Sequence, residues 1–93
     1  MTRFRAAIPP DVAETIRHLP PELKRSIKAA VRALADNPHL GEPLVRELEG
    51  FWKYRVKRFR IVYSIHAKRK EVRLLAVGHR RTIYEDVVKQ YVG

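Results

Sequence analysis

The sequence predicts an α+β domain with two N-terminal helices, a small antiparallel sheet and a short C-terminal helix. Apolar residues recur every three or four positions in the N-terminal half, which is typical of amphipathic helices. In the C-terminal half apolar and charged residues alternate, which is typical of strands. The length of 93 residues leaves room for one core, so we expect a single domain over residues 1–93.

Prolines mark the ends of the elements in the N-terminal half. We expect a short strand over residues 3–8, stopped by Pro9 and Pro10 because proline lacks the N–H that a strand ladder needs. Helices are expected over residues 10–18 and 21–36, folded back on each other so that one apolar stripe covers the sheet. The residues of that stripe are Val12, Ile16, Leu19, Leu23, Ile27, Val31 and Leu34.

A change of period follows the second helix. Residues 39–50 contain Pro, Gly and three Glu residues without any period, and we expect an irregular connector there. From Phe51 on, apolar residues alternate with cations, which predicts a strand with one core face and one cationic face. Residues 59–66 and 71–78 are rich in β-branched and aromatic residues, and they predict two further strands of an antiparallel meander.

The last element is predicted by a capping signal. Thr82 is followed three residues later by Glu85, a capping-box pattern. It predicts a short helix over residues 82–91.

The net charge of +10 is concentrated in the C-terminal half. Residues 1–50 contain 8 Lys or Arg and 7 Asp or Glu, whereas residues 51–93 contain 12 and 3, so the halves carry +1 and +9. Such a field favours a polyanionic partner, with nucleic acid ahead of an acidic protein and of anionic lipid. A charged surface that serves only solubility is the alternative, although it leaves the asymmetry unexplained.

Several classes of protein are excluded or disfavoured. The chain has no cysteine, so it has no disulfide, thiolate metal site or Cys nucleophile. The four His residues lack paired ligand spacing, and we expect no metal and no cofactor. The N-terminus has no apolar run suited to a signal peptide, and no segment has the length of a membrane span, so we expect a cytoplasmic protein without membrane contact.

The basic residues of the C-terminal half are suited to cleaving RNA without a metal. This reaction needs a group that takes the proton of the ribose 2′-OH, cations that stabilise the phosphorane-like transition state, and a donor for the leaving 5′-oxygen. The cations on adjacent strands or strand ends are Lys53, Arg55, Arg60 and Arg80. Tyr84 is a candidate for base stacking or proton transfer, and His79 lies at a strand end.

The order LEGFWKYRVKRFRIVYSI and then VRLLAVGHRRTIY resembles the RelE branch of the RelE/ParE toxins of type II toxin–antitoxin systems. The resemblance implies two N-terminal helices on a twisted, mainly antiparallel sheet with a short C-terminal helix. It also implies cleavage of messenger RNA on the ribosome and neutralisation by a cognate protein antitoxin. Such a toxin is bacterial or archaeal.

The resemblance also implies site residues. The catalytic set of the RelE branch falls here on Lys53, Arg55, Arg60, Arg80 and Tyr84. Arg55 departs from the family pattern, which has a second Lys there; because Arg is a poor proton acceptor, Lys53 or another group must be the base. A related subgroup uses a connector Glu and a C-terminal His, which fall on Glu42 and His79, and we rank this set second. The remaining cations expected to bind RNA are Lys57, Arg58 and Arg81.

Other interpretations stay open at this level. A ParE-like inhibitor of DNA gyrase and a catalytically silent module that binds nucleic acid or antitoxin are the alternative functions. Lys53 and Arg55 can also be charges that keep an edge strand from pairing, and Tyr84 can be a packing residue.

Overall fold

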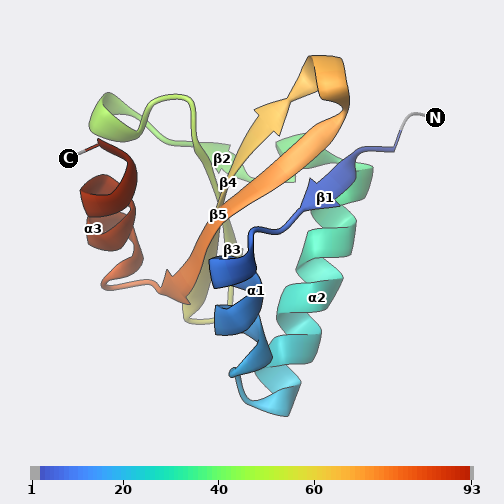
Figure 1. Ribbon diagram of the computed structural model, residues 1–93, viewed down its shortest axis with the longest axis vertical. Coiled ribbons are helices and arrows are strands. Elements are labelled where there is room, and N and C mark those ends of the chain that lie inside the picture. Colours follow the sequence, from blue (N-terminus) through green and yellow to red (C-terminus); the bar gives the residue numbers. More distant parts are fainter. Residues whose placement is uncertain (1–2, 93) are drawn as a thin grey trace.

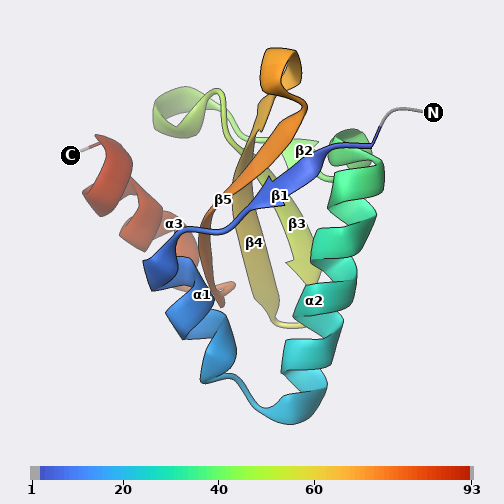
Figure 2. The same cartoon turned by 45° about the vertical axis from the view of Figure 1, so that its right-hand side comes forward.

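A five-stranded mixed sheet lies between two helical layers, with α1 and α2 against one face and α3 against the other (Figure 1 and Figure 2). The structure is a computed structural model, and it describes residues 3–92. The strands and helices are β1 (Arg5–Ala7), α1 (Pro10–Arg17), α2 (Pro21–Asp36), β2 (Glu42–Pro43), β3 (Trp52–Val56), β4 (Phe59–His66), β5 (Glu71–His79) and α3 (Ile83–Val87). Short 3₁₀ turns are formed by Pro38–Leu40, Arg46–Leu48 and Ala67–Arg69, and a π-helical turn, Val88–Val92, follows α3.

The meander of β3, β4 and β5 makes up most of the sheet, whose strand order is β1-β5-β4-β3-β2. These three strands pair antiparallel, as the sequence predicted, and β2 is antiparallel to β3. β1 pairs in parallel with β5, with Arg5 opposite Glu71. The α+β class and the mainly antiparallel sheet are therefore confirmed, with one parallel pair at an edge.

Both N-terminal helices begin at prolines. Pro10 and Pro21 lie in the first turn, where a missing N–H removes no intrahelical hydrogen bond. The predicted stripe faces the sheet, and its residues Ile16, Ile27 and Leu34 are buried. None of the helices in residues 3–92 has the length and apolar content that crossing a bilayer requires.

Each face of the sheet has its own apolar cluster. Ile61 and Tyr63 of β4 are fully buried beneath α1 and α2. Val62 of β4 points to the other face, where it joins Leu75 of β5 and Ile83 of α3. A register shift between Val62 and Tyr63 leaves Leu75 without a partner in the β4–β5 ladder, as in a β-bulge. The cationic face of β3 therefore adjoins a second small core.

Three local predictions differ from the structure. The first strand is shorter than residues 3–8, because only Arg5–Ala7 have partners on β5. The connector is not wholly irregular, because Glu42–Pro43 pairs with β3. The terminal helix follows Thr82 as predicted, but the capping box is wrong: the backbone of Thr82 is helical rather than extended, and its side chain makes no capping hydrogen bond.

Candidate functional site

Cations of β3 project from the sheet face that α3 covers in part. Trp52, Tyr54 and Val56 belong to the cluster beneath α1 and α2, so the alternate residues Lys53 and Arg55 lie on the other face. The predicted alternation is confirmed. The second core was not predicted, and it places α3 beside these cations.

Arg60 lies next to Arg55 across the β3–β4 ladder. The two residues are directly opposite in register, and Arg60 is opposite Gly78 on its other side. Like charges in this position destabilise a sheet by up to about 1 kcal/mol. The Arg60 guanidinium donates hydrogen bonds to the carbonyl oxygens of Lys57 at 3.1 Å and Phe59 at 2.9 Å, which fixes it near the β3–β4 turn.

Arg80 comes to the same place from the end of β5. Its backbone N–H donates to the carbonyl of Arg58 at 2.8 Å, which ties the end of β5 to the β3–β4 turn. Lys57 and Arg58 form that turn and are exposed, as is Arg81 beyond it. The three residues expected to bind RNA therefore border the predicted catalytic cations.

Tyr84 lies in α3, half-buried against the second core. The Lys53 ammonium is 5.9 Å from the centroid of its ring, within the range of a cation–π interaction. α3 approaches β5 closely because Ile83 packs on Gly78, where an added Cβ would lie 2.8 Å from Ile83 Cδ1. Packing and proximity to the cations thus coexist at Tyr84.

The connector holds Glu42 beside Lys53. The two residues pair in the β2–β3 ladder, and Glu42 Oε1 is 3.9 Å from Lys53 Nζ. Gly41 makes this approach possible, because an added Cβ would collide with the carbonyl oxygen of Lys53 and the hydroxyl of Tyr63. A glycine immediately before β2 is therefore a condition for the Glu42–Lys53 pair.

Tyr63 supports the connector from the core. Its hydroxyl donates to the Pro38 carbonyl at 2.7 Å and accepts from the Gly41 N–H at 3.2 Å. Burial raises the pKa of Tyr63 to about 12, against the opposing effect of the Gly41 hydrogen bond and with a smaller contribution from Tyr54. The strand pattern predicts Tyr63 only as part of residues 59–66. The signal for its role is that a buried tyrosine hydroxyl needs a hydrogen-bond partner.

His79 lies on the opposite face of the sheet. It pairs with Phe59 in the β4–β5 ladder, and the two rings meet edge to face at 5.9 Å. In a regular strand His79 would share a face with the β3 cations, but the extra residue Leu75 reverses the alternation. Of Glu42 and His79, which form the second-ranked set, only Glu42 adjoins the cations, through Lys53.

We call Lys53, Arg55, Arg60, Arg80 and Tyr84 the cationic site. Within residues 3–92, Glu42 is the one carboxylate within 4.0 Å of any of its cations. The same part of the chain contains no group of three His, Cys, Asp or Glu residues suited to holding a metal ion. Unpaired guanidinium groups at adjacent strand ends can contact several oxygens of one phosphodiester.

Comparisons with known proteins identify the family of this chain. Residues 8–84 match the family model described as ParE toxin of type II toxin–antitoxin system, parDE. Toxin RelE of Mycobacterium tuberculosis is 29% identical over 83 residues, which cover 87% of this chain and 86% of that protein.

Solved structures show the same fold. A chain of the toxin–antitoxin complex RelBE2 from Mycobacterium tuberculosis has a TM-score of 0.78 and 27% identity, covering 86% of this chain and 94% of its own length. A mutant of the E. coli toxin RelE in the free state also has a TM-score of 0.78, with 16% identity over 98% of this chain and 100% of that one. At 16% identity the likeness concerns the fold alone.

Proposed function

Because this chain belongs to the ParE toxin family of type II toxin–antitoxin systems, within the RelE/ParE superfamily, we propose that it is an endoribonuclease that cleaves messenger RNA on the ribosome. The observation that carries the proposal is the cationic site, in which Arg55 and Arg60 lie opposite each other with no carboxylate within 4.0 Å among residues 3–92. Holding such charges together costs stability, and a bound phosphodiester offsets that cost.

The arginines stabilise charge during the reaction. When the ribose 2′-oxygen attacks phosphorus, negative charge grows on the non-bridging oxygens. Arg55, Arg60 and Arg80 remain protonated throughout and can hold those oxygens with paired N–H donors. The Tyr84 ring, half-buried at the rim of the site, offers a face on which a nucleobase stacks.

Glu42 and Lys53 are the proposed proton-transfer pair. Glu42 takes the proton of the 2′-OH as a carboxylate, and the Lys53 ammonium donates a proton to the departing 5′-oxygen, leaving a 2′,3′-cyclic phosphate and a 5′-OH. Their separation of 3.9 Å lets a proton return from Glu42 to Lys53 after the bond breaks. With Glu42 as the base, the reaction needs no proton acceptor at Arg55, which stands where the family pattern has a second Lys and is a poor proton acceptor.

The proposed partners are the ribosome with its bound messenger RNA and a cognate antitoxin. The net charge of +10 favours association with an RNA-rich particle. The similar Mycobacterium tuberculosis structure is a toxin–antitoxin complex, which supports a protein antitoxin for this chain as well. Both partners imply action in the cytoplasm.

Primer extension on messenger RNA translated in vitro tests the proposal. The wild-type protein should create new 5′ ends in translated RNA and few in the same RNA without ribosomes, and Arg60→Ala, Arg80→Ala and Glu42→Gln should remove them. Lys68→Ala is the matched control, because Lys68 is an exposed cation in the turn before β5, outside the cationic site. Wild-type protein that yields no new ends, with or without ribosomes, refutes the proposal.

A second candidate function is inhibition of DNA gyrase, because the matching family model is described as ParE toxin. A supercoiling assay separates the two. Inhibition by wild-type protein and equally by Arg60→Ala, without RNA cleavage by either, would favour gyrase as the target over messenger RNA.

A further inference from the structure

A pocket lies at the edge of the sheet, directly beside the cationic site, and we call it the edge pocket. It has a volume of about 640 Å³ and opens along β3 at the point where β2 ends. Its lining consists of Leu40, Gly41, Glu42, Lys53, Tyr54, Arg55 and Lys57. Because Lys53 and Arg55 belong both to this lining and to the cationic site, RNA held by the cationic site reaches into the edge pocket.

The edge pocket exists because β2 is short. β2 pairs Glu42 with Lys53, and a continued strand would place Leu40 opposite Arg55. Instead Leu40 belongs to a 3₁₀ turn, in which its N–H donates to the Asn37 carbonyl at 3.2 Å. The edge of β3 beyond Lys53 therefore has no neighbouring strand among residues 3–92.

The open edge presents backbone groups of Arg55 to the pocket. In an antiparallel sheet, alternate residues direct their N–H and C=O groups to the same side of a strand. The Leu44 N–H donates to the Phe51 carbonyl at 2.8 Å, so that carbonyl points towards the β2 side of β3. Lys53 and Arg55 follow at intervals of two and direct their groups to the same side, but β2 reaches only Lys53. Arg55 thus offers a donor beside an acceptor, which complements the Watson–Crick edge of an unpaired nucleobase.

Leu40 adds an apolar surface to these polar groups. It is 47% exposed, although it is a large aliphatic residue. The half-buried Tyr54 lines the same pocket. A nucleobase has apolar faces and a polar edge, and apolar or aromatic side chains cover such faces when the base is unpaired. The edge pocket therefore matches both parts of a base.

We propose that the edge pocket binds the base of the nucleotide whose 2′-OH attacks phosphorus, and that Leu40 packs against the face of that base. The assignment to this nucleotide rests on the proposed function, in which Glu42 takes the proton of the 2′-OH. Glu42 lines the edge pocket and lies 3.9 Å from Lys53, the proposed donor to the leaving oxygen. The base on the 5′ side of the cleaved bond is therefore the one that reaches Leu40.

Charge favours a nucleotide over a peptide as the occupant. An extended peptide can also pair with an open strand edge, because its backbone supplies alternating donors and acceptors. A peptide backbone carries no negative charge, however, whereas the phosphates on either side of a bound base meet the cations Lys53, Arg55 and Lys57 of the lining. A base between two phosphates uses the backbone groups, the apolar surface and the charges together.

Binding of a non-cleavable RNA to the full chain provides the direct test. The probe is a dinucleotide with a single phosphodiester, in which 2′-deoxyribose replaces the ribose of the 5′ nucleotide and so removes the attacking 2′-OH. A second probe also lacks the base of that 5′ nucleotide. NMR titration measures the dissociation constants of both probes for wild-type protein and for Leu40→Ser, and this measurement requires no cleavage.

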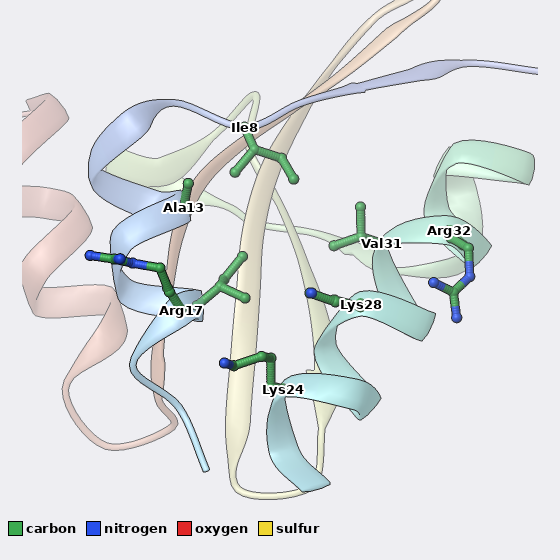
Figure 3. A pocket seen from close by; sticks show the side chains of 8 residues that line it. Ile8, Ala13, Arg17, Lys24, Lys28, Val31 and Arg32 are labelled. Carbon is green, nitrogen blue, oxygen red and sulfur yellow. The ribbon is translucent and has the colours of Figure 1, made fainter. Parts of the chain in front are cut away.

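Ile8→Ser is the matched control. Ile8 is 41% exposed, close to the value for Leu40, and it lines a different pocket, the groove between α1 and α2 (Figure 3). Figure 3 shows cations beside it as well, with Lys24 and Lys28 extending from α2 towards α1. This groove lies on the opposite side of the sheet from the cationic site. Ile8→Ser therefore exchanges a similar side chain in a similar setting, away from the proposed RNA contacts.

The effects of the base and of Leu40 should depend on each other. Loss of the base should weaken binding to wild-type protein and to Ile8→Ser about tenfold, but binding to Leu40→Ser about twofold or less. Leu40→Phe should keep the dependence on the base, since an aromatic ring covers a base at least as well as leucine does. Thermal melting checks that every variant is folded.

Two outcomes would overturn the edge-pocket assignment: an equal effect of the base on wild-type protein and Leu40→Ser, or no saturable binding of the dinucleotide at millimolar concentration. The second outcome, with saturable binding of an extended uncharged peptide that shifts the Arg55 amide resonance, would instead assign the open edge to a peptide strand.

Primer extension on the same proteins separates this proposal from the nuclease activity. Base-dependent binding that requires Leu40, without cleavage by the wild type, refutes only the nuclease. Cleavage by a wild-type protein whose dinucleotide affinity is indifferent to the base refutes only the edge pocket.

Discussion

Arginines near the two ends of the β4–β5 hairpin differ in whether a carboxylate pairs with them. Near the β4–β5 turn, the buried carboxylate of Glu71 lies 3.6 Å from Arg5 of β1 and 3.2 Å from Arg73 of β5, so both cations are neutralised. At the open end, Arg60 lies opposite Arg55, and within residues 3–92 neither has a carboxylate within 4.0 Å. At the first end, which we call the paired end, ion pairs join β1 to β5. At the open end the positive charges of Arg55 and Arg60 have no carboxylate partner among the described residues.

The paired end shows what this fold does with a cation that serves stability. Burial by itself would raise the pKa of Glu71, but the hydrogen bonds and charges of Arg73 and Arg5 outweigh it and hold the pKa below its usual value. Carboxylate partners for arginine are thus available to this chain. Within residues 3–92 the arginines of the cationic site have none within 4.0 Å, which is what the proposed binding of a phosphodiester requires.

Removing one arginine from each end should produce opposite results. Arg60→Ala is expected to lower the single-turnover rate of RNA cleavage by about 100-fold or more, because the transition state loses a charged donor. Its stability should change little, since the lost hydrogen bonds to Lys57 and Phe59 are offset by relief of the repulsion from Arg55.

Arg73→Ala is the matched substitution at the paired end. It should lower the melting temperature and leave the cleavage rate unchanged at a temperature where the variant is folded. The distinction between the ends breaks down when Arg60→Ala keeps its activity, or when Arg73→Ala loses activity while folded.

The paired end should also be the acid-sensitive one. The folded-state pKa of Glu71 is below that of the unfolded chain, so its stabilising effect is present above pH about 4.3 and is lost as pH falls through the folded value. Glu71→Gln should therefore melt several degrees below wild type at pH 7, with the two curves converging in acid. The exposed Glu85 provides the control Glu85→Gln, and a difference that is the same at every pH would contradict this origin.

Much of the fold follows from local pattern. The alternation of residues 52–57 is a property of neighbouring positions, and it was enough to place Lys53 and Arg55 on a common face. Tandem prolines likewise fix where α1 and α2 begin. The parallel pairing of β1 with β5 joins residues more than 60 positions apart, as in Arg5 and Glu71, and no local pattern specifies it.

The cationic site was less accessible from the sequence wherever it depends on register. One extra residue, Leu75, moves His79 to the other face of the sheet. The residues next to Leu75 in the sequence give no signal that predicts this bulge. The pairing of Glu42 with Lys53 depends on Gly41 and on the distant hydroxyl of Tyr63. Periodicity assigns a residue to a face, whereas the contacts between faces and connectors come from tertiary packing.

Removal of the Tyr63 hydroxyl oxygen should destabilise the connector of residues 39–50. Tyr63→Phe removes the hydroxyl that bonds Pro38 and Gly41, and we expect a loss of about 1–2 kcal/mol in the free energy of unfolding. Cleavage should fall several-fold because Glu42 is held less firmly beside Lys53. Tyr54→Phe, a neighbouring half-buried tyrosine on the same face, is the control, and denaturant melts with cleavage rates measure both. Equal effects of the two substitutions would remove the proposed role of the Tyr63 hydroxyl.

The smallest expected effect comes from two lysines with a left-handed backbone, one near each end of the β4–β5 hairpin. Lys57 in the β3–β4 turn and Lys70 before β5 both have left-handed backbones, with φ of 57° and 51°. Asn tolerates this conformation better than Lys, so Lys57→Asn and Lys70→Asn should each stabilise the protein by about 0.5 kcal/mol in denaturant melts.

Only Lys57→Asn should also reduce cleavage, because Lys57 borders the cationic site while Lys70 lies at the paired end. Arg58→Asn controls for lost charge, since Arg58 lies in the same turn without a positive φ. It should reduce cleavage without the gain in stability. Equal cleavage by Lys57→Asn and Lys70→Asn would mean that Lys57 takes no part in RNA binding. The proposed RNA contacts at this end of the sheet would then come from the residues of the cationic site and not from the β3–β4 turn.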